Sequence, residues 1–326
     1  MNDKDRTIWT AIWNDRSFKL SILLTLVFLG IGIAFLFLEL VDYSWVLFIL
    51  LPFALGIAIG SLPVRKYTLL GVLFSAILSL VAMYVPGFSG FICIVMAFGL
   101  VAPFILLGHV IVRLVKRYRE IKETSRLPVL LLPLIPFLIA APAEHFLKKD
   151  KEAIIAVTSE QIFNYTPDQV YDAIKSVDTM DAEKPFLMYF DLPIPVKCVL
   201  EKEEVGGTRT CYFRQGNLSN FDFGGGTITE KITQLERGKI LKMDVTECNI
   251  IGRKWIGFKE AIYYFDKAGE HNCKVTRITT YTSVLTPRFY WEPMEELGIR
   301  QEHEYVFNNL AKDLQNKYGG VDKQKD

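Results

Sequence analysis

The chain has 326 residues, enough for two domains, and its formal net charge of +1 gives no strong basic field, so nucleic acid is not an expected partner. Hydrophobic residues make up 51% of the sequence, and most of this excess lies before residue 148. Of the five cysteines, none belongs to a CxxC pair, so neither a zinc ribbon nor a thioredoxin-type site is expected.

The first 147 residues consist largely of apolar stretches. Residues 1–17 are polar, with two tryptophans that suit a membrane interface. Four stretches are then long enough to cross the hydrocarbon core of about 30 Å; they cover residues 18–41, 43–62, 67–85 and 91–112. A fifth, 127–143, contains four prolines, so it either crosses or follows a re-entrant path. The sequence therefore predicts an all-α transmembrane bundle of four or five helices.

Lysine and arginine predict the orientation of this bundle. They cluster before the first stretch, between the second and the third, and in residues 113–126. The positive-inside rule places these segments in the cytoplasm, and we expect the membrane to be a bacterial cytoplasmic membrane. If 127–143 crosses, the chain after Lys148 is extracytoplasmic, and if it does not, that part is cytoplasmic. Glu39 and His109 lie near predicted helix ends, which favours an anchor over an ion path.

The second half of the chain has the pattern of an antiparallel sheet. Residues 153–163 read as a strand, and residues 166–169 form a capping box that begins a helix over 167–176. Three pairs of strands follow, each pair joined by a turn that contains glycine; they are 196–203 with 208–214, 227–235 with 239–248, and 258–265 with 273–284. Apolar residues at helical spacing predict one long helix over 293–317.

This order of elements resembles the START-like (SRPBCC) superfamily, in particular its polyketide cyclase/dehydrase and lipid-transport branch. The segments that carry the resemblance are 157–163, 166–174, 206–209, 229–232 and the helix after Pro293. It covers residues 152–317 and leaves 318–326 as a polar tail. The resemblance implies an α+β helix-grip fold, in which a curved antiparallel sheet surrounds the long C-terminal helix. It also implies a deep cavity between sheet and helix for lipids or apolar small molecules.

Arg209 and Glu230 are the most informative polar residues in this half. Strand alternation places Arg209 on the same face as Cys211 and Phe213, and Glu230 on the same face as two isoleucines, so both are predicted to point toward the interior. Charged groups there need a partner. They match positions where similar START-like domains often carry Arg and Glu. Either they form a structural ion pair at the cavity mouth, or they orient a ligand.

His303 lies on the apolar stripe of the predicted long helix, where a lone histidine is either a hydrogen-bonded core residue or an acid/base group. The aromatic residues of the strands could line a cavity or pack in the core, and alternation does not decide which tyrosines point inward. The predicted ligand-binding residues are Arg209, Glu230, Phe213, Trp255, Tyr263, Tyr281, His303, Val306, Phe307 and Leu310.

The main functional hypothesis is a membrane-anchored START-like domain that binds a hydrophobic small molecule or a lipid without catalysis. One alternative is a cyclase- or dehydratase-like enzyme, for which His303 and Glu230 are the only catalytic candidates. Another is a ligand sensor or assembly factor at the membrane. No cofactor and no metal is indicated. Cys198 and Cys211 lie symmetrically about a turn, so they are either a cross-strand disulfide of an extracytoplasmic domain or two small core residues.

Overall fold

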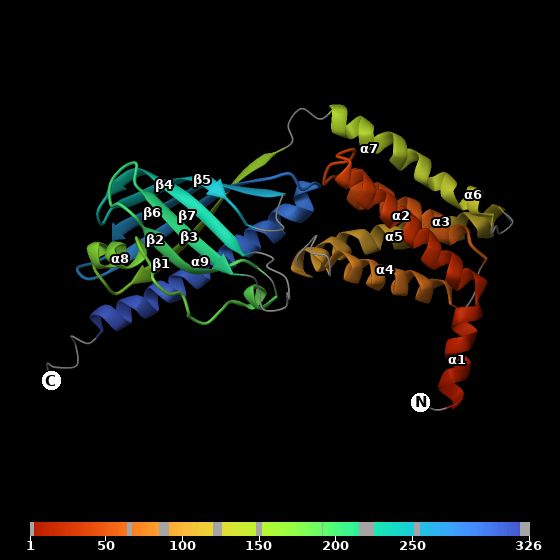
Figure 1. Ribbon diagram of the computed structural model, residues 1–326, viewed down its shortest axis with the longest axis horizontal. Helices are drawn as coiled ribbons and strands as arrows, with labels where there is room; N and C mark the ends of the chain where they lie inside the picture. The colour runs from red at the N-terminus through yellow and green to blue at the C-terminus, as the bar shows by residue number, and fades with distance from the viewer. Residues whose placement is uncertain are drawn as a thin grey trace. The chain divides into compact units, whose positions relative to one another are not determined.

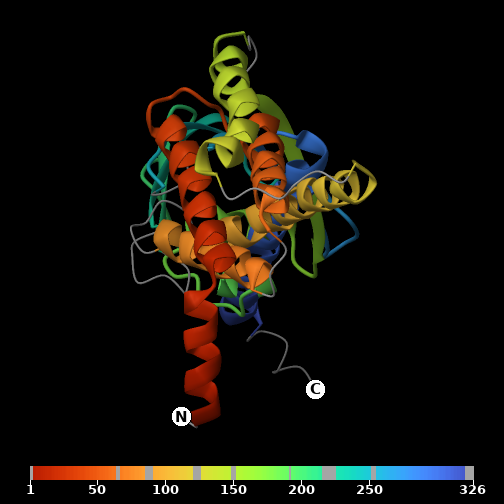
Figure 2. The ribbon, with the colours of Figure 1, turned by 90° about the vertical axis from the view of Figure 1, so that its right-hand side faces the viewer.

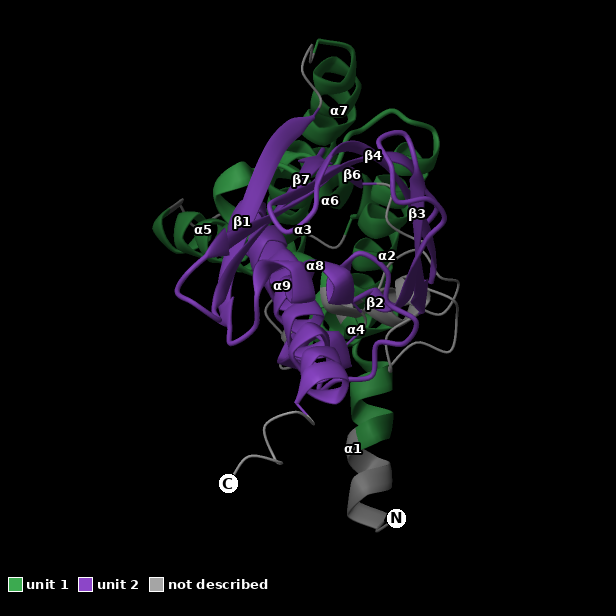
Figure 3. Cartoon of the chain, turned by 90° about the vertical axis from the view of Figure 1, so that its left-hand side faces the viewer, with its two compact units in different colours: residues 1–88, 93–151, 285–290 green, residues 89–92, 152–284, 291–326 purple. Residues whose placement is uncertain are grey.

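The computed structural model describes residues 3–63, 67–84, 91–119, 126–147, 152–190, 192–214, 225–250 and 255–319. The chain divides into two compact units, which Figure 3 colours separately. Unit 1 comprises residues 1–88, 93–151 and 285–290, and unit 2 comprises residues 89–92, 152–284 and 291–326. We describe each unit by itself.

Unit 1 consists of helices, most of them apolar, coloured red to yellow-green in Figures 1 and 2. Within the described ranges, three helical stretches are long and apolar enough to cross a membrane, namely Arg16–Phe37, Cys93–Tyr118 and Leu127–Leu147. The helices of this unit are α1 (Asp3–Asn14), α2 (Arg16–Phe37), η1 (Val46–Leu50), α3 (Leu51–Ser61), α4 (Thr68–Tyr84), α5 (Phe91–Arg119), α6 (Leu127–Leu131), η2 (Leu132–Leu134) and α7 (Ile135–Leu147).

The proline-rich stretch is helical from Leu127 to Leu147, four residues beyond its predicted end. Pro128 and Pro133 lie at the first positions of α6 and η2, where a backbone N–H has no intrahelical acceptor. Only Pro142 interrupts the interior of α7. The prolines therefore divide residues 127–147 into short helical segments, and the chain does not reverse direction within them.

Contacts at the two ends of unit 1 show that successive helices alternate in direction. At one end, Ser17 Oγ at the start of α2 donates to the carbonyl of Pro63, and Lys116 Nζ near the end of α5 donates to the carbonyl of Ser61. At the other end, Asp42 accepts a hydrogen bond from His145 near the end of α7, with the two atoms 3.0 Å apart. The path from Arg126 through α7 therefore runs from the first end to the second.

Small residues allow the helices of unit 1 to approach closely. A Cβ atom on Gly56 of α3 would lie 2.2 Å from the carbonyl oxygen of Ile105 in α5, and one on Gly108 would lie 2.4 Å from the carbonyl oxygen of Phe53. Only glycine fits this crossing, an arrangement typical of helix pairs in lipid. The hydroxyl of the buried Ser21, where α2 faces α4, donates to a carbonyl of its own helix.

Unit 2 is a seven-stranded antiparallel sheet in the order β1-β7-β6-β5-β4-β3-β2, curled around a long helix (Figure 1). The helix-grip fold predicted from the sequence is confirmed. Its elements are β1 (Ala153–Phe163), α8 (Pro167–Ile174), η3 (Phe186–Tyr189), β2 (Ile194–Leu200), β3 (Thr208–Arg214), β4 (Gly226–Glu236), β5 (Ile240–Cys248), β6 (Ile256–Lys267), β7 (Cys273–Ser283) and α9 (Arg288–Tyr318).

Alternation along the strands gives the sheet an inner face toward α9. On β7 every second residue from Cys273 to Ser283 is buried, and β4 buries Ile228, Glu230 and Ile232 in the same way. Register shifts in three of the strand pairs bend the sheet. The predicted capping box is present at the start of α8, which packs on β6 and β7.

The long helix begins at Arg288, five residues before the predicted start at Pro293. Proline has no backbone N–H to donate and is common in the first turn of a helix, so the helix was predicted to begin at Pro293. Trp291 and Glu295, on either side of it, are both buried. Their burial holds the helix through the proline.

Candidate functional site

A group of polar side chains lies on the inner face of unit 2, where apolar residues would be expected. It draws on β1, β3, β4, β6, β7 and α9, which are distant in sequence but adjacent in the sheet and its helix. We call this group the polar layer. Its members are Ser159, Arg209, Glu230, Tyr263, Arg277, Thr279, Glu302 and His303.

Arg209 and Glu230 form a buried ion pair within this layer. They stand directly opposite each other on β3 and β4, and are 3% and 6% exposed. Glu230 Oε2 accepts from Arg209 Nη2 at 2.7 Å and from Nε at 2.8 Å, and Arg209 Nη1 donates to the carbonyl of Ile174. Burial alone would lower the pKa of Arg209, but the Glu230 carboxylate and the Tyr263 hydroxyl raise it, so the guanidinium remains charged.

Tyr263 connects this pair to a second arginine. Its ring lies 5.7 Å from the Arg209 Cζ and 5.4 Å from the Arg277 Cζ, and Tyr263 is the direct register partner of Arg277 on β7. Arg277 Nη2 donates to Glu302 Oε1 of α9 at 3.1 Å and lies 2.8 Å from Oε2. Burial acts to lower the pKa of Arg277, while Glu302 and Tyr263 raise it. Two cations thus flank one aromatic ring inside the unit.

Arg277 retains hydrogen-bonding capacity that this pair does not use. The residue is 8% exposed, and both Nε and Nη1 are inaccessible to solvent. Within the described part of the chain, no group accepts a hydrogen bond from either nitrogen. Buried guanidinium donors are costly to leave unsatisfied, so this feature needs an explanation.

His303 is fully buried beside Arg277, with hydroxyls on both sides of its ring. Nε2 lies 2.8 Å from Thr279 Oγ1, and Nδ1 lies 2.9 Å from Ser159 Oγ. Burial, together with the nearby positive charges of Arg277 and Arg300, lowers the pKa of His303 to about 2. The imidazole is therefore neutral at pH 7 and links β1, β7 and α9 by hydrogen bonds.

The remaining predicted site residues divide between core and periphery. Val306, Phe307 and Leu310 pack in the main hydrophobic cluster of unit 2. Tyr281 points inward and donates to Glu295 Oε2 at 3.2 Å. The other two, Trp255 and Phe213, are only half-buried. Alternation left the orientation of the tyrosines open, and the structure shows that Tyr263 and Tyr281 both face the interior.

Sequence reasoning missed the second ion pair, Arg277 with Glu302. Alternation along β7 contained a usable signal, because Arg277 shares a face with the buried Val275 and Tyr281. Its partner lies next to His303 on α9, 25 residues farther along the chain, so no local spacing pointed to the pair.

Cys198 and Cys211, for which two interpretations were open, form a disulfide between β2 and β3. They are direct partners in the strand register, and Cys211 Sγ lies 4.0 Å from Glu230 Oε2. The disulfide therefore joins the edge hairpin next to the Arg209–Glu230 pair.

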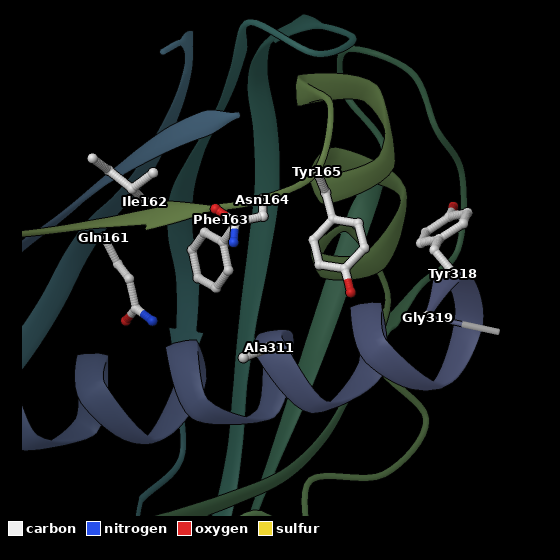
Figure 4. Close-up of a pocket in the computed structure, with 8 residues that line it drawn as sticks. All are labelled: Gln161, Ile162, Phe163, Asn164, Tyr165, Ala311, Tyr318 and Gly319. Carbon is white, nitrogen blue, oxygen red and sulfur yellow. The ribbon is translucent and has the colours of Figure 1, made fainter. Parts of the chain in front are cut away.

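A surface hollow of about 360 Å³ lies between the end of β1 and the end of α9 (Figure 4). It contains none of the predicted ligand-binding residues. Its lining consists of Gln161, Ile162, Phe163, Asn164, Tyr165, Ala311, Tyr318 and Gly319. Among the residues that the structure describes, no group of three or more His, Cys, Asp or Glu side chains could hold a metal ion.

Among known proteins, this chain is similar only to solved structures. No family model matches the chain, and no curated protein matches it. A norcoclaurine synthase mutant from Thalictrum flavum is 11% identical, with a TM-score of 0.33, over 52% of this chain and 99% of that one. The Zhui aromatase/cyclase from Streptomyces sp. R1128 is 12% identical, with a TM-score of 0.35, over 52% and 98%.

A Staphylococcus aureus protein of unknown function is also 12% identical, with a TM-score of 0.36 over 52% of this chain and 98% of its own. Such identities and scores transfer no function from one protein to another. The assignment of unit 2 as an α+β helix-grip fold preceded by apolar helices rests on its strand order and on α9.

Proposed function

We propose that unit 2 binds an amphipathic small molecule or lipid between its sheet and α9, without catalysis. The polar layer carries this proposal, because along β7 and α9 its residues separate two apolar clusters of the interior. The larger cluster includes Val275 and Leu310, and the smaller one includes Val157, Tyr281 and Ile299. An interior with charged groups amid apolar surface suits a ligand that has one polar group on an apolar body.

The state of His303 supports binding over catalysis. A general acid or base is effective when its pKa lies near the working pH. The pKa of His303 is about 2, because burial disfavours its charged form, and both ring nitrogens already contact hydroxyl groups. Glu230, the other catalytic candidate, is held by Arg209. The groups proposed for chemistry are thus engaged in holding the interior together.

We also propose that unit 1 is embedded in a membrane. Supporting this are its three long apolar helices and its small-residue packing. Large apolar side chains are exposed along α5, among them Leu106, Val110 and Leu114. Contiguous exposed apolar surface is unfavourable in water and suits contact with lipid.

For topology, we propose five crossings, with the N-terminus in the cytoplasm and unit 2 outside. The alternating helix directions and the helical path from Leu127 to Leu147 support an odd number of crossings. The Cys198–Cys211 disulfide suits an oxidising compartment. A cysteine introduced at Lys267, in a chain whose native cysteines are replaced, tests this by labelling of intact cells with an impermeant thiol reagent. Labelling only after permeabilisation would contradict the proposed topology.

The binding proposal is tested with the full chain in nanodiscs. A fatty acid that carries an environment-sensitive fluorophore is added, and empty nanodiscs supply the background. We expect saturable fluorescence enhancement beyond that background and its competition by the unlabelled fatty acid. Fluorescence that only matches empty nanodiscs would contradict binding by unit 2.

A further inference from the structure

The hydrogen-bond donors of the polar layer differ in whether they have an acceptor within the protein. Arg209 directs Nε and Nη2 to Glu230 and Nη1 to the carbonyl of Ile174, so each of its nitrogens has an acceptor. The hydroxyls of Thr279 and Ser159 are bound to His303. These groups are already satisfied by the fold.

Arg277 differs, because Glu302 contacts only its Nη2. Nε and Nη1 are buried and have no acceptor among the described residues, and the side chain as a whole is 9% exposed. Glu302 is more exposed, at 20%, so water screens its charge more than that of the buried guanidinium. The arginine thus offers two buried donors and a positive charge that is only partly offset.

Apolar groups lie on both sides of Arg277 along the inner face of its strand, with the polar Thr279 between it and one of them. Val275 precedes it on the inner face of β7, and Tyr281 follows after Thr279. A ligand whose polar end meets Arg277 would therefore lay its remaining atoms against apolar side chains. Guanidinium groups bind carboxylate and phosphate oxygens with strong charge-assisted hydrogen bonds.

Resting on the proposed function, we infer that the bound amphiphile carries an acidic oxygen group, either a carboxylate or a phosphate, and that Arg277 donates to it through Nε and Nη1. Arg209 holds the interior together, and Arg277 recognises the head group. Neutral amphiphiles of the same length should bind more weakly, because they bring no charge to the guanidinium.

The test uses the full chain in nanodiscs and three photoreactive probes that carry a diazirine on the acyl chain: a fatty acid, its methyl ester and a phosphatidic acid. Mass spectrometry quantifies adducts on peptides from residues 152–319, which separates unit 2 from labelling of the apolar helices. We expect half-maximal labelling by one of the acidic probes at a concentration at least about tenfold below that of the ester. The more potent acidic probe identifies the head group as carboxylate or phosphate.

In Arg277→Met this preference should disappear, with ester labelling unchanged. Arg237→Met, which removes an exposed arginine, should keep it. Should Arg277→Met fail to fold, Arg277→Lys retains a cation without the planar donors, and it should lose at least about threefold of the preference. A full preference in either folded variant, or equal labelling by acid and ester in the natural chain, would overturn the inference and leave the proposed function standing. Absence of labelling in residues 152–319 by every probe would overturn the proposed function itself.

Discussion

Separating the two members of the Arg209–Glu230 pair should destabilise unit 2 far more than removing both together. Each group is almost fully buried, so Arg209→Met leaves an unpaired carboxylate in the interior, and Glu230→Leu leaves an unpaired guanidinium. Breaking a buried pair in this way costs about 3–5 kcal/mol. The double variant buries two apolar side chains in place of the charges, and it should return close to the stability of the natural chain.

Native-state hydrogen exchange of the full chain measures this directly, on peptides that cover β3 and β4. A cost of about 3–5 kcal/mol corresponds to exchange faster by a factor of roughly one hundred to several thousand. Lys312→Met is the matched control, because Lys312 is 44% exposed and pairs with Asp181 on the surface. That variant should change exchange less than about fivefold. Single variants no different from this control, or a double variant whose cost is the sum of the two, would refute the reasoning.

Three further predictions follow from other contacts. His303 binds a proton in the unfolded chain below about pH 6.5 but in the folded chain only near pH 2, so acidification favours unfolding and should lower the free energy of unfolding by about 2 kcal/mol by pH 5. Thermal unfolding of His303→Gln should therefore depend less steeply on pH than that of the natural chain. An unchanged slope would count against this prediction. Gly56→Leu should destabilise unit 1 by at least about 1–3 kcal/mol in detergent melts, whereas Gly30→Ala, which meets open space, should not. Reduction of the Cys198–Cys211 disulfide should destabilise unit 2 by about 3 kcal/mol, and alkylation of Cys198 and Cys211 themselves in the folded chain without reductant would contradict the bond.

Local sequence patterns predicted most of the fold. The bounds of β1 and β3 agree with the structure, because alternation and flanking turn residues specify a strand within its own sequence. The start of α9 was predicted five residues late, because the burial of Trp291 and Glu295 overrides the local effect of Pro293.

The candidate site could be predicted only in part. Arg209 and Glu230 were predicted to point toward the interior because each shares a strand face with apolar residues. In the structure they are direct partners in the strand register. Alternation along β7 could have identified Arg277 as a buried residue, but its contacts with Tyr263 and with Glu302 of α9 could not be predicted. Contacts between distant elements of this kind are fixed by packing in three dimensions and leave no signal in local spacing.

The most direct test of the central claim is mass spectrometry of what unit 2 carries when the full chain is purified in mild detergent without added lipid. Native spectra of the intact chain would report a bound mass, and extraction would identify it. We predict one amphiphile per chain, retained in Lys312→Met, which removes only the exposed ion pair between Lys312 of α9 and Asp181. A chain that carries no amphiphile beyond those found on an unrelated membrane protein purified in the same way would contradict the account.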